Sequence, residues 1–423
     1  MRTKIIDYGM NGEGIGKVDG KTYFISNALI GEDVEFKIIL DKQNYAFASS
    51  SEIYQPSPER TSPPCPYFYE CGGCSLQHMK YPHQLDFKSL LVKKTLKKIT
   101  DIDLDVSSTY PSKQFKYRNK ASFNTNGTNV GFFKKESNDI VNIDYCMLMN
   151  DDINQLFAIF KTYLSTLDKD KVSLIKHLVV RAIDHQILVG LVIKRDFECT
   201  DFYSQLKNTF SKIGLYKIIN NRRDSVVLSG KTIHVSGIKE ICINNFNLTY
   251  SVDLLGFHQT NIEIQNSIYQ KVLELIDPDS IVVNGFSGEG LLSGILASKA
   301  RHVYGIEISP SSHKSAEKLK RENHIVNLKN ILGDFNIMID SLLNQVDSLI
   351  LDPSKKGCGK EIMNKIIGIK NIIYISCNPI ALAKDLRFLT KYYIIDYMKP
   401  FDMFPNTNSV ETLIHLKLKK EKQ

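Results

Sequence analysis

The first 55 or so residues contain short segments in which hydrophobic and polar positions alternate, separated by glycines. Residues 21–25 (KTYFI) and 32–39 (EDVEFKII) are the clearest of these segments. Strands at this spacing are typical of a small β-barrel, which can pair its own edges within such a length. The prolines and serines of residues 55–64 can continue neither a strand nor a helix. We therefore predict a β-barrel over residues 1–57, followed by a domain boundary.

Between this barrel and residue 255 the pattern is mixed. Residues 85–99 place hydrophobic side chains at helical spacing, with lysines on the opposite face, which predicts an amphipathic helix. Beyond residue 115, strand-like segments such as 187–193 (ILVGLVI) alternate with short helical ones. We interpret residues 58–255 as a central α+β domain.

From residue 256 on, helical and strand-like patterns alternate regularly. The helical segments are 261–276, 291–300 and 311–323, and the strand-like segments are 280–283, 302–308, 348–351, 371–375 and 411–418. Alternation at this spacing predicts a doubly wound α/β domain of the Rossmann type over residues 256–423.

The length of the chain, 423 residues, agrees with two or three domains. Hydrophobic residues make up 43% and charged residues 24%, a globular balance that excludes a disordered or collagen-like chain. No apolar run approaches the roughly 20 residues of a membrane helix, and the start has no apolar signal region, so we expect a soluble, cytoplasmic protein with no membrane partner. The net charge of +8 is compatible with a polyanionic partner.

Three of the eight cysteines lie within ten residues of one another. Cys65, Cys71 and Cys74 have the spacing C-x5-C-x2-C, with two glycines in the second interval. Glycines let such a loop wrap closely around a metal centre, and Cys146 is the best candidate in chain order for a fourth ligand. Zinc and an iron–sulfur cluster both accept four thiolates, so the spacing leaves the metal open.

A glycine-rich turn, residues 284–290 (NGFSGEG), follows a predicted strand and opens a helix. Gly288 there lets backbone N–H groups approach a ligand at the helix N-terminus, and Glu307, 19 residues later, can bind both hydroxyls of a ribose. Asp334 and Asp352 also end predicted strands, where ligand groups gather in open α/β sheets. The set favours S-adenosylmethionine over a nicotinamide cofactor, because the G-x-G-x-x-G form typical of the latter is missing.

A further cysteine, Cys377, stands at the end of a late strand in the segment ISCNP. Its sulfur would lie over the cofactor crevice, and the N-terminus of the following helix could lower the pKa of the thiol. A thiolate there suits attack on an electron-poor ring carbon. Glu411, at the start of the last β segment, is a candidate general base.

Together these motifs resemble the S-adenosylmethionine-dependent RNA 5-methyluridine methyltransferases, and specifically their iron–sulfur branch acting on large-subunit (23S) ribosomal RNA. The similar segments, in chain order, are CPYFYECGGCSLQH (65–78), FKYRNKASF (115–123), VGFF (130–133), NIDYCMLM (142–149), GFHQTN (256–261), NGFSGEG (284–290), SCNP (376–379) and SVET (409–412). The resemblance covers nearly the whole chain.

The resemblance implies an OB-like TRAM barrel that binds RNA, a central domain with a cysteine-ligated 4Fe–4S cluster, and a class I methyltransferase domain. It implies that the four cysteines bind the cluster, that Cys377 adds to C6 of a uracil, and that Glu411 removes the C5 proton. The implied cofactor-binding residues are Gln259, Phe286, Gly288, Glu307, Asp334 and Asp352. Large-subunit ribosomal RNA is the implied partner, and we expect a monomer without an obligate protein partner.

Four positions depart from the family pattern. Asn284 stands where the family usually has Asp, and Ser409 stands where it has His. Ser354 and Lys355 replace Pro and Arg, and a lysine cannot reproduce a bidentate arginine contact. These differences bear on substrate choice and rate, whereas the residues of the reaction itself are retained.

Two other functions fit parts of the pattern. One is a transfer RNA uracil-5-methyltransferase, but members acting there typically lack the barrel and the cluster cysteines. The other is a non-catalytic RNA-binding or ribosome-assembly protein that kept the fold, and the intact Cys377 and Glu411 argue against it.

Overall fold

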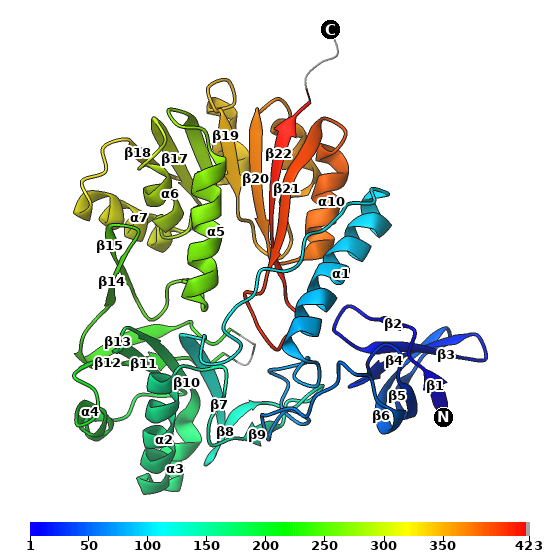
Figure 1. The fold of residues 1–423 in the computed structure, drawn as a ribbon. Coiled ribbons are helices and arrows are strands. Elements are labelled where there is room, and N and C mark those ends of the chain that lie inside the picture. The colour runs from blue at the N-terminus through cyan, green and yellow to red at the C-terminus, as the bar shows by residue number, and fades with distance from the viewer. Residues whose placement is uncertain (223, 225, 420–423) are drawn as a thin grey trace.

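The computed structural model describes residues 1–222, 224 and 226–419, and its chain forms three units (Figure 1). The first unit consists of β1 (Arg2–Lys4), β2 (Asp7–Tyr8), β3 (Gly14–Val18), β4 (Lys21–Ser26), β5 (Asp33–Asp41) and β6 (Tyr45–Gln55). The strands pair in the order β1-β5-β6-β4-β3-β2. Because β1 and β2 are consecutive pieces of the same segment, the sheet closes on itself. The predicted N-terminal β-barrel is therefore confirmed.

The second unit is a mixed sheet with helices against it. Its elements are β7 (Lys120–Asn126), β8 (Asn129–Phe133), β9 (Ile140–Asn142), α2 (Asp151–Thr166), α3 (Lys169–Leu174), β10 (Ile175–Ile183), β11 (Gln186–Ile193), α4 (Thr200–Lys207), β12 (Lys212–Ile219) and β13 (Lys231–Gly237). The sheet order is β13-β12-β11-β10-β7-β8-β9. Leu156, Phe157 and Phe160 of α2 are fully buried in the core with residues of the sheet. A hairpin, β14 (Ile241–Asn245) and β15 (Leu248–Val252), leads into the third unit.

The third unit is a doubly wound α/β domain, as predicted. Its elements are α5 (Ile262–Leu275), β16 (Ile281–Gly285), α6 (Leu291–Leu296), β17 (His302–Glu307), α7 (Pro310–Glu322), β18 (Leu328–Leu332), α8 (Phe335–Met338), a 3-10 turn (Ile339–Ser341), β19 (Ser348–Leu351), α9 (Gly359–Lys365), β20 (Asn371–Ser376), α10 (Pro379–Leu389), β21 (Tyr393–Phe401) and β22 (Glu411–Leu418). The sheet order is β18-β17-β16-β19-β20-β22-β21, and only β22 runs antiparallel to its neighbours. No helix in the described part of the chain is both long and apolar enough to cross a membrane.

Two predicted helices differ from the observed ones at their ends. The helix expected over 85–99 is α1 (Tyr81–Thr100), which begins earlier because Pro82 suits the first helical turn. The helix expected over 291–300 ends at Leu296, where the N–H groups of Lys299 and Ala300 both bond to the Leu296 carbonyl. Ala300, beyond this end, is still buried, so the hydrophobic periodicity extends past the helix.

Helix α1 connects the barrel with the third unit, and a buried ion pair fixes it there. Lys88 Nζ lies 2.5 Å from Asp402 Oδ1, and both side chains are fully buried. Lys88 Nζ also donates to the Phe404 carbonyl at 3.0 Å, and the Tyr81 hydroxyl donates to Asp402 Oδ2 at 2.9 Å. The segment between β21 and β22 is thereby attached to α1.

Asn406, in the same segment, joins three distant parts of the chain. The N–H groups of Ser75 and Leu76 both donate to its carbonyl at 3.0 Å. Its side-chain oxygen accepts from Gln84 of α1 and from Gln114, and its Nδ2 donates to the Gln114 carbonyl. Asn406 is fully buried with φ 67°, a left-handed conformation that asparagine tolerates. The loop that carries Cys74, α1 and the approach to β22 therefore form one network.

Replacement of Lys88 by methionine leaves Asp402 buried without its cation. We expect Lys88→Met to destabilise the protein by about 3–5 kcal/mol, because an uncompensated buried carboxylate is costly. Denaturant unfolding measures the loss, and hydrogen exchange of residues 402–409 locates it. Lys98→Met, at an exposed position of the same helix, is the matched control. Equal stabilities of the two variants would contradict the role given to the ion pair.

Candidate active site

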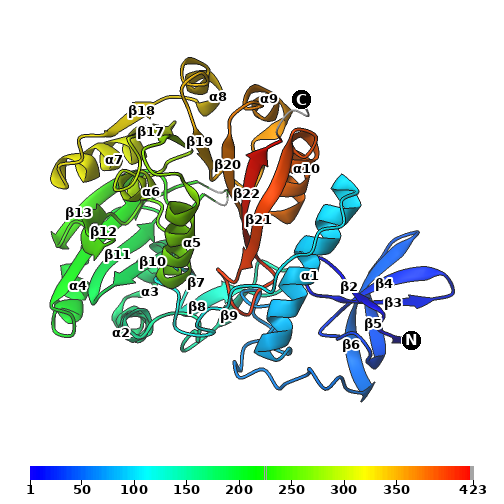
Figure 2. The same cartoon turned by 45° about the horizontal axis from the view of Figure 1, so that its top comes forward.

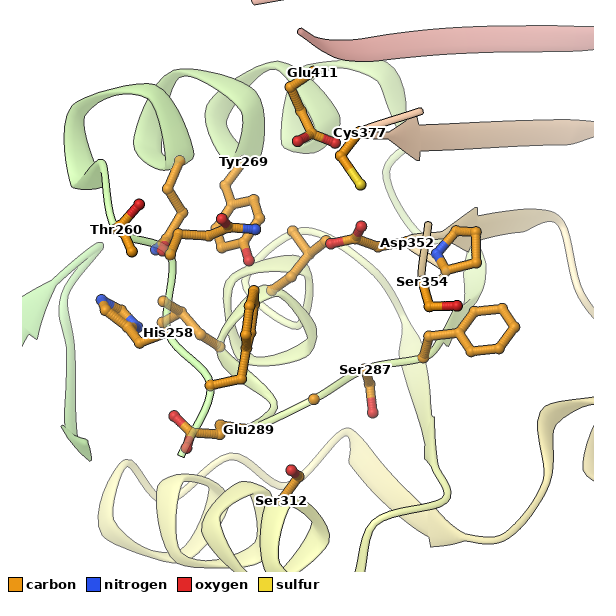
Figure 3. Close-up of a pocket in the computed structure, with 18 of the residues that line it drawn as sticks. His258, Thr260, Tyr269, Ser287, Glu289, Ser312, Asp352, Ser354, Cys377 and Glu411 are labelled. Atoms are coloured by element: carbon orange, nitrogen blue, oxygen red, sulfur yellow. The ribbon is translucent and has the colours of Figure 1, made fainter. Parts of the chain in front are cut away.

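A cavity of about 800 Å³ opens at the carboxyl ends of β16, β17, β19 and β20 (Figure 3). This is the edge at which open α/β sheets bind ligands. Gly73 and Arg118 also line the cavity, so residues before the third unit contribute to its wall.

The glycine-rich turn after β16 positions the Glu307 carboxylate. The Gly288 N–H donates to Glu307 Oε2 at 2.9 Å, and the Ser309 N–H donates to Oε1 at 2.7 Å. Gly288 has φ +55°, and a Cβ there would meet no atom within 4 Å. A Cβ at Gly290 would lie 2.6 Å from Ala316 Cβ, so glycine is required for the contact between the turn and α7. The turn thus leaves open space beside a fixed carboxylate.

Several buried polar atoms in the cavity wall have no partner. Ser287 Oγ, Thr260 Oγ1 and Gln265 Nε2 line the cavity and form no hydrogen bond to any described residue. Buried polar groups are normally paired, so these atoms fit a polar ligand. The Phe286 ring, 5.1 Å from the Phe335 ring, adds an aromatic surface. A nucleoside cofactor such as S-adenosylmethionine matches this combination.

Five of the six predicted cofactor residues line this cavity. They are Gln259, Phe286, Gly288, Glu307 and Asp352. Asp334 does not line it, because its carboxylate caps α8 and accepts from the Asn336 N–H at 2.9 Å. Asn284 also lies outside the lining and donates to Ser293 Oγ at 2.9 Å.

Strand pairing brings Cys377 and Glu411 together. Ser376, the last residue of β20, pairs with Thr412 of β22 in antiparallel register, so Cys377 just beyond β20 lies next to Glu411, the first residue of β22. Figure 3 shows Cys377, Glu411 and Asp352 at one end of the cavity, with Ser287 and Glu289 towards the other. A ligand of nucleotide size can therefore span both ends.

Burial makes the groups at this end less acidic than usual. Burial, and then the Asp352 charge, raises the pKa of Glu411 well above its ordinary value, while burial raises the pKa of Asp352 to about 7. Burial and then Glu411 raise the pKa of Cys377 to about 11, against a lowering effect of Lys355. The expected lowering of this pKa by the helix N-terminus is wrong for this state, because burial and then the neighbouring Glu411 favour the neutral thiol. Cys377 is therefore a neutral thiol before substrate binds.

A second cluster of charged residues lies around Glu289, and the sequence did not predict it. Burial and then Asp253 raise the pKa of Glu289 to about 7, opposed by Arg181 and Lys120. Arg181 is fully buried and donates from Nη2 to the Gly256 carbonyl at 2.5 Å. That bond holds the start of the segment that carries Gln259. Lys120 stands within a segment quoted for the resemblance, whereas nothing in the sequence marks Arg181.

The four predicted metal ligands line a second cavity, of about 290 Å³. Burial raises the pKa of Cys74 to about 12 and that of Cys146 to about 11. In the described part of the chain, no three His, Cys, Asp or Glu side chains lie close enough together to hold a single metal ion. Gly73 and Arg118 line both cavities, so the cysteine loop borders the active-site cavity despite its distance in sequence from Cys377.

Comparison with protein families gives two matches. The family described as tRNA (Uracil-5-)-methyltransferase matches residues 80–419, and the TRAM domain matches residues 2–50.

Related proteins align along nearly the whole chain. A Clostridium tetani protein named uncharacterized RNA methyltransferase is 31% identical, covering 97% of this chain and 94% of the relative. A Staphylococcus epidermidis protein of the same name is 31% identical, covering 99% and 97%. The crystal structure of Pyrococcus abyssi tRNA (uracil-54, C5)-methyltransferase in complex with S-adenosyl-L-homocysteine has a TM-score of 0.80 at 23% identity, covering 98% of this chain and 99% of that one. At 23% identity, the similarity to this crystal structure shows a shared fold.

Replacement of Glu411 by glutamine should stabilise the protein at alkaline pH. The pKa of Glu411 is raised in the folded state, so ionisation favours the unfolded chain and folded stability falls as pH rises above about 4.5. Glutamine cannot ionise and removes this loss. We expect the unfolding temperature of Glu411→Gln to lie a few degrees above that of the wild type at pH 8, since 1 kcal/mol shifts it by ~2–4 °C. At pH 4 the two proteins should unfold at the same temperature.

Thermal unfolding at the two pH values measures the difference. Glu136→Gln, at an exposed position, is the control and should unfold with the wild type at both. A Glu411→Gln variant that is no more stable than the wild type at pH 8 would show that Glu411 ionises freely in the folded protein.

Proposed function

Because this chain belongs to the tRNA (uracil-5-)-methyltransferase family and carries a TRAM domain, we propose that it methylates C5 of a uridine in 23S ribosomal RNA. As a member of that family it is an S-adenosylmethionine-dependent RNA methyltransferase. The observation that carries the proposal is the convergence of Cys377, Glu411 and Asp352 at one end of the cofactor-sized cavity. A thiol nucleophile beside a carboxylate base is what methylation of a uracil ring carbon needs.

We propose the following roles for the cofactor-binding residues. Glu307 would accept hydrogen bonds from the ribose hydroxyls, because two backbone N–H groups already orient its oxygens. Phe286 would pack on the adenine, and Gln259 would orient the methionine end. Bound S-adenosylmethionine supplies an electrophilic methyl group on a positively charged sulfur.

The protein residues would act in turn on the uracil. Cys377 gives its proton to solvent and its thiolate sulfur bonds to C6, which opens the C5–C6 double bond and makes C5 nucleophilic. After C5 has gained the methyl group, the Glu411 carboxylate accepts the C5 proton. The C6–S bond then breaks, and Cys377 and 5-methyluridine are released. Burial, and then the neighbouring Asp352 charge, raises the pKa of Glu411, which makes Glu411 a stronger base once ionised.

The target base must leave its stack to reach Cys377. The chain has no tryptophan, so an aromatic surface for the base must come from Phe or Tyr. Three aromatic residues line the cavity and can supply it: Phe257, Phe404 and Tyr269. Phe257 is 71% exposed, so its ring is accessible to an incoming base.

Ribosomal RNA is the substrate favoured by the first half of the chain. The support for this choice is the resemblance of residues 65–78 and 142–149, which carry the four cysteines, to the branch that acts on 23S ribosomal RNA. Transfer RNA is the second candidate, because a uridine in tRNA is the target named for the Pyrococcus abyssi structure. We further propose a cytoplasmic monomer with units at residues 1–57, 58–255 and 256–423.

We also propose that Cys65, Cys71, Cys74 and Cys146 bind a 4Fe–4S cluster. The four side chains line one cavity, and their thiols are a donor set that such a cluster accepts. The Asn406 network would let the cluster stabilise the wall of the active site.

Methyl transfer from labelled S-adenosylmethionine to unmodified 23S ribosomal RNA, followed by mapping of the product, tests the function. We expect 5-methyluridine at a defined position, no transfer by Cys377→Ala, and a slow-migrating covalent RNA–protein adduct with Glu411→Gln. The adduct accumulates because addition survives while removal of the C5 proton does not.

Cys358→Ala is the matched control, since Cys358 is another partly buried thiol of the third unit and lies outside the cavity lining. Its turnover should equal that of the wild type. Residual turnover by Cys377→Ala would overturn the nucleophile. Methylation of a tRNA transcript but not of ribosomal RNA would overturn the substrate.

Anaerobic purification followed by iron, sulfide and zinc analysis tests the cluster. We expect about four iron and four sulfide per chain, and loss of both in Cys146→Ser. Cys242→Ser, at an exposed cysteine, should retain them. Stoichiometric zinc without sulfide would refute the cluster.

A further inference from the structure

A separate hollow of about 340 Å³ lies beside the active site, between α9, α10 and the end of α1. Figure 2 shows these helices on one side of the third unit. Ile99 and Phe388 give the hollow an apolar wall, and Lys356, Lys360, Lys384 and Arg387 surround it with positive charge. All four cations are exposed.

The charge of this hollow is not neutralised by the protein. Within the described part of the chain, none of the four cations has a carboxylate within 4.0 Å. By contrast, Lys365 on α9 pairs with Asp340, and Lys370 just beyond α9 pairs with Asp347.

The one acid in the wall, Asp385, is directed inwards. It is 3% exposed and accepts from the N–H groups of Cys358 and Gly359 at 2.8 and 3.1 Å. The Tyr374 hydroxyl also donates to it, at 2.6 Å. Its oxygens are therefore engaged in fixing the loop before α9, and the accessible rim is cationic.

The hollow and the active-site cavity share one loop. Asp352, Ser354 and Lys355 line the active-site cavity, and the next residue, Lys356, lines the hollow. Asn378, next to Cys377, donates from Nδ2 to the Lys355 carbonyl at 2.9 Å. This bond fixes the loop against the catalytic strand end. A polymer with one unit at Cys377 can therefore reach the cationic rim with neighbouring units.

We propose that this hollow binds the phosphates of RNA nucleotides that flank the target uridine. Lys356, Lys360, Lys384 and Arg387 contact the phosphate oxygens, and the apolar wall accommodates a sugar or base. The inference rests on the proposed function for the identity of the nucleotide at Cys377, but the phosphate site itself does not depend on methyl transfer.

The salt dependence of RNA binding tests the site. Each phosphate contact on a single strand contributes about 0.7 to the slope of log affinity against log salt concentration. We expect the quadruple variant K356Q/K360Q/K384Q/R387Q to lower the magnitude of this slope by about 1.5–2, which corresponds to the loss of two or three phosphate contacts. The variant should bind RNA ~10–100-fold more weakly at physiological salt. The affinity for S-adenosylmethionine and the turnover at saturating RNA should change less than about twofold.

Two further variants make the result specific. The quartet K207Q/K212Q/K231Q/K239Q removes the same charge from exposed positions of the central unit and should retain the wild-type slope. The triple variant K356R/K360R/K384R keeps the charge and should bind RNA as the wild type does.

Equal slopes for the two glutamine quartets would overturn the phosphate site, because any loss would then reflect net charge alone. Competition by inorganic phosphate as effective as competition by RNA would also overturn it, since the hollow would then hold a free anion. A wild type that binds RNA without methylating it would refute the proposed function, whereas the slopes would still decide the phosphate site.

Discussion

The buried ion pair between Lys88 and Asp402 is the interaction on which the active site depends. It attaches the segment between β21 and β22 to α1, and Asn406 in that segment accepts the N–H groups of Ser75 and Leu76. The segment ends at Glu411, the proposed base. A single network thus connects the cysteine loop, the helix from the barrel and the catalytic strand end. Two desolvated charges are stable there only as a pair, so the network favours one arrangement of the three units.

The same burial determines the chemistry of the catalytic groups. Asp352, Glu411 and Cys377 share a poorly solvated end of the cavity, where each charge raises the cost of the next. In the free protein the proposed nucleophile, Cys377, is therefore a thiol, and the proposed base, Glu411, has a raised pKa. Lys355 is the cation that lowers the pKa of Cys377 and so favours the thiolate. Lys355 stands where the resemblance would place an arginine, so this substitution changes the side chain whose charge lowers the pKa of Cys377.

Local patterns in the sequence predicted the barrel, the doubly wound domain and the cavity residues Gly288, Glu307 and Asp352, because strand ends and glycine turns are encoded by neighbouring residues. The sequence could not reveal Lys88–Asp402, whose partners lie 314 positions apart, or the contact of the cysteine loop with the active site. It also predicted the wrong direction for the pKa of Cys377, since the burial of the thiol depends on the tertiary fold and the effect of Glu411 depends on the pairing of β20 with β22. Asp334 follows a predicted strand, as a ligand-binding aspartate would, but its carboxylate caps α8. The sequence alone does not distinguish ligand binding from helix capping at such a position.

The central claim is that Cys377 forms a covalent bond to the uracil ring. RNA that carries 5-fluorouridine at the target position traps such a bond, because fluorine at C5 cannot leave as the proton does. The direct measurement is mass spectrometry of protease-digested wild-type enzyme after reaction with this RNA and S-adenosylmethionine. The account predicts one modified peptide, which carries a methylated fluorouridine nucleotide on Cys377. A nucleotide on any other cysteine, or methylation without a covalent peptide, would contradict it.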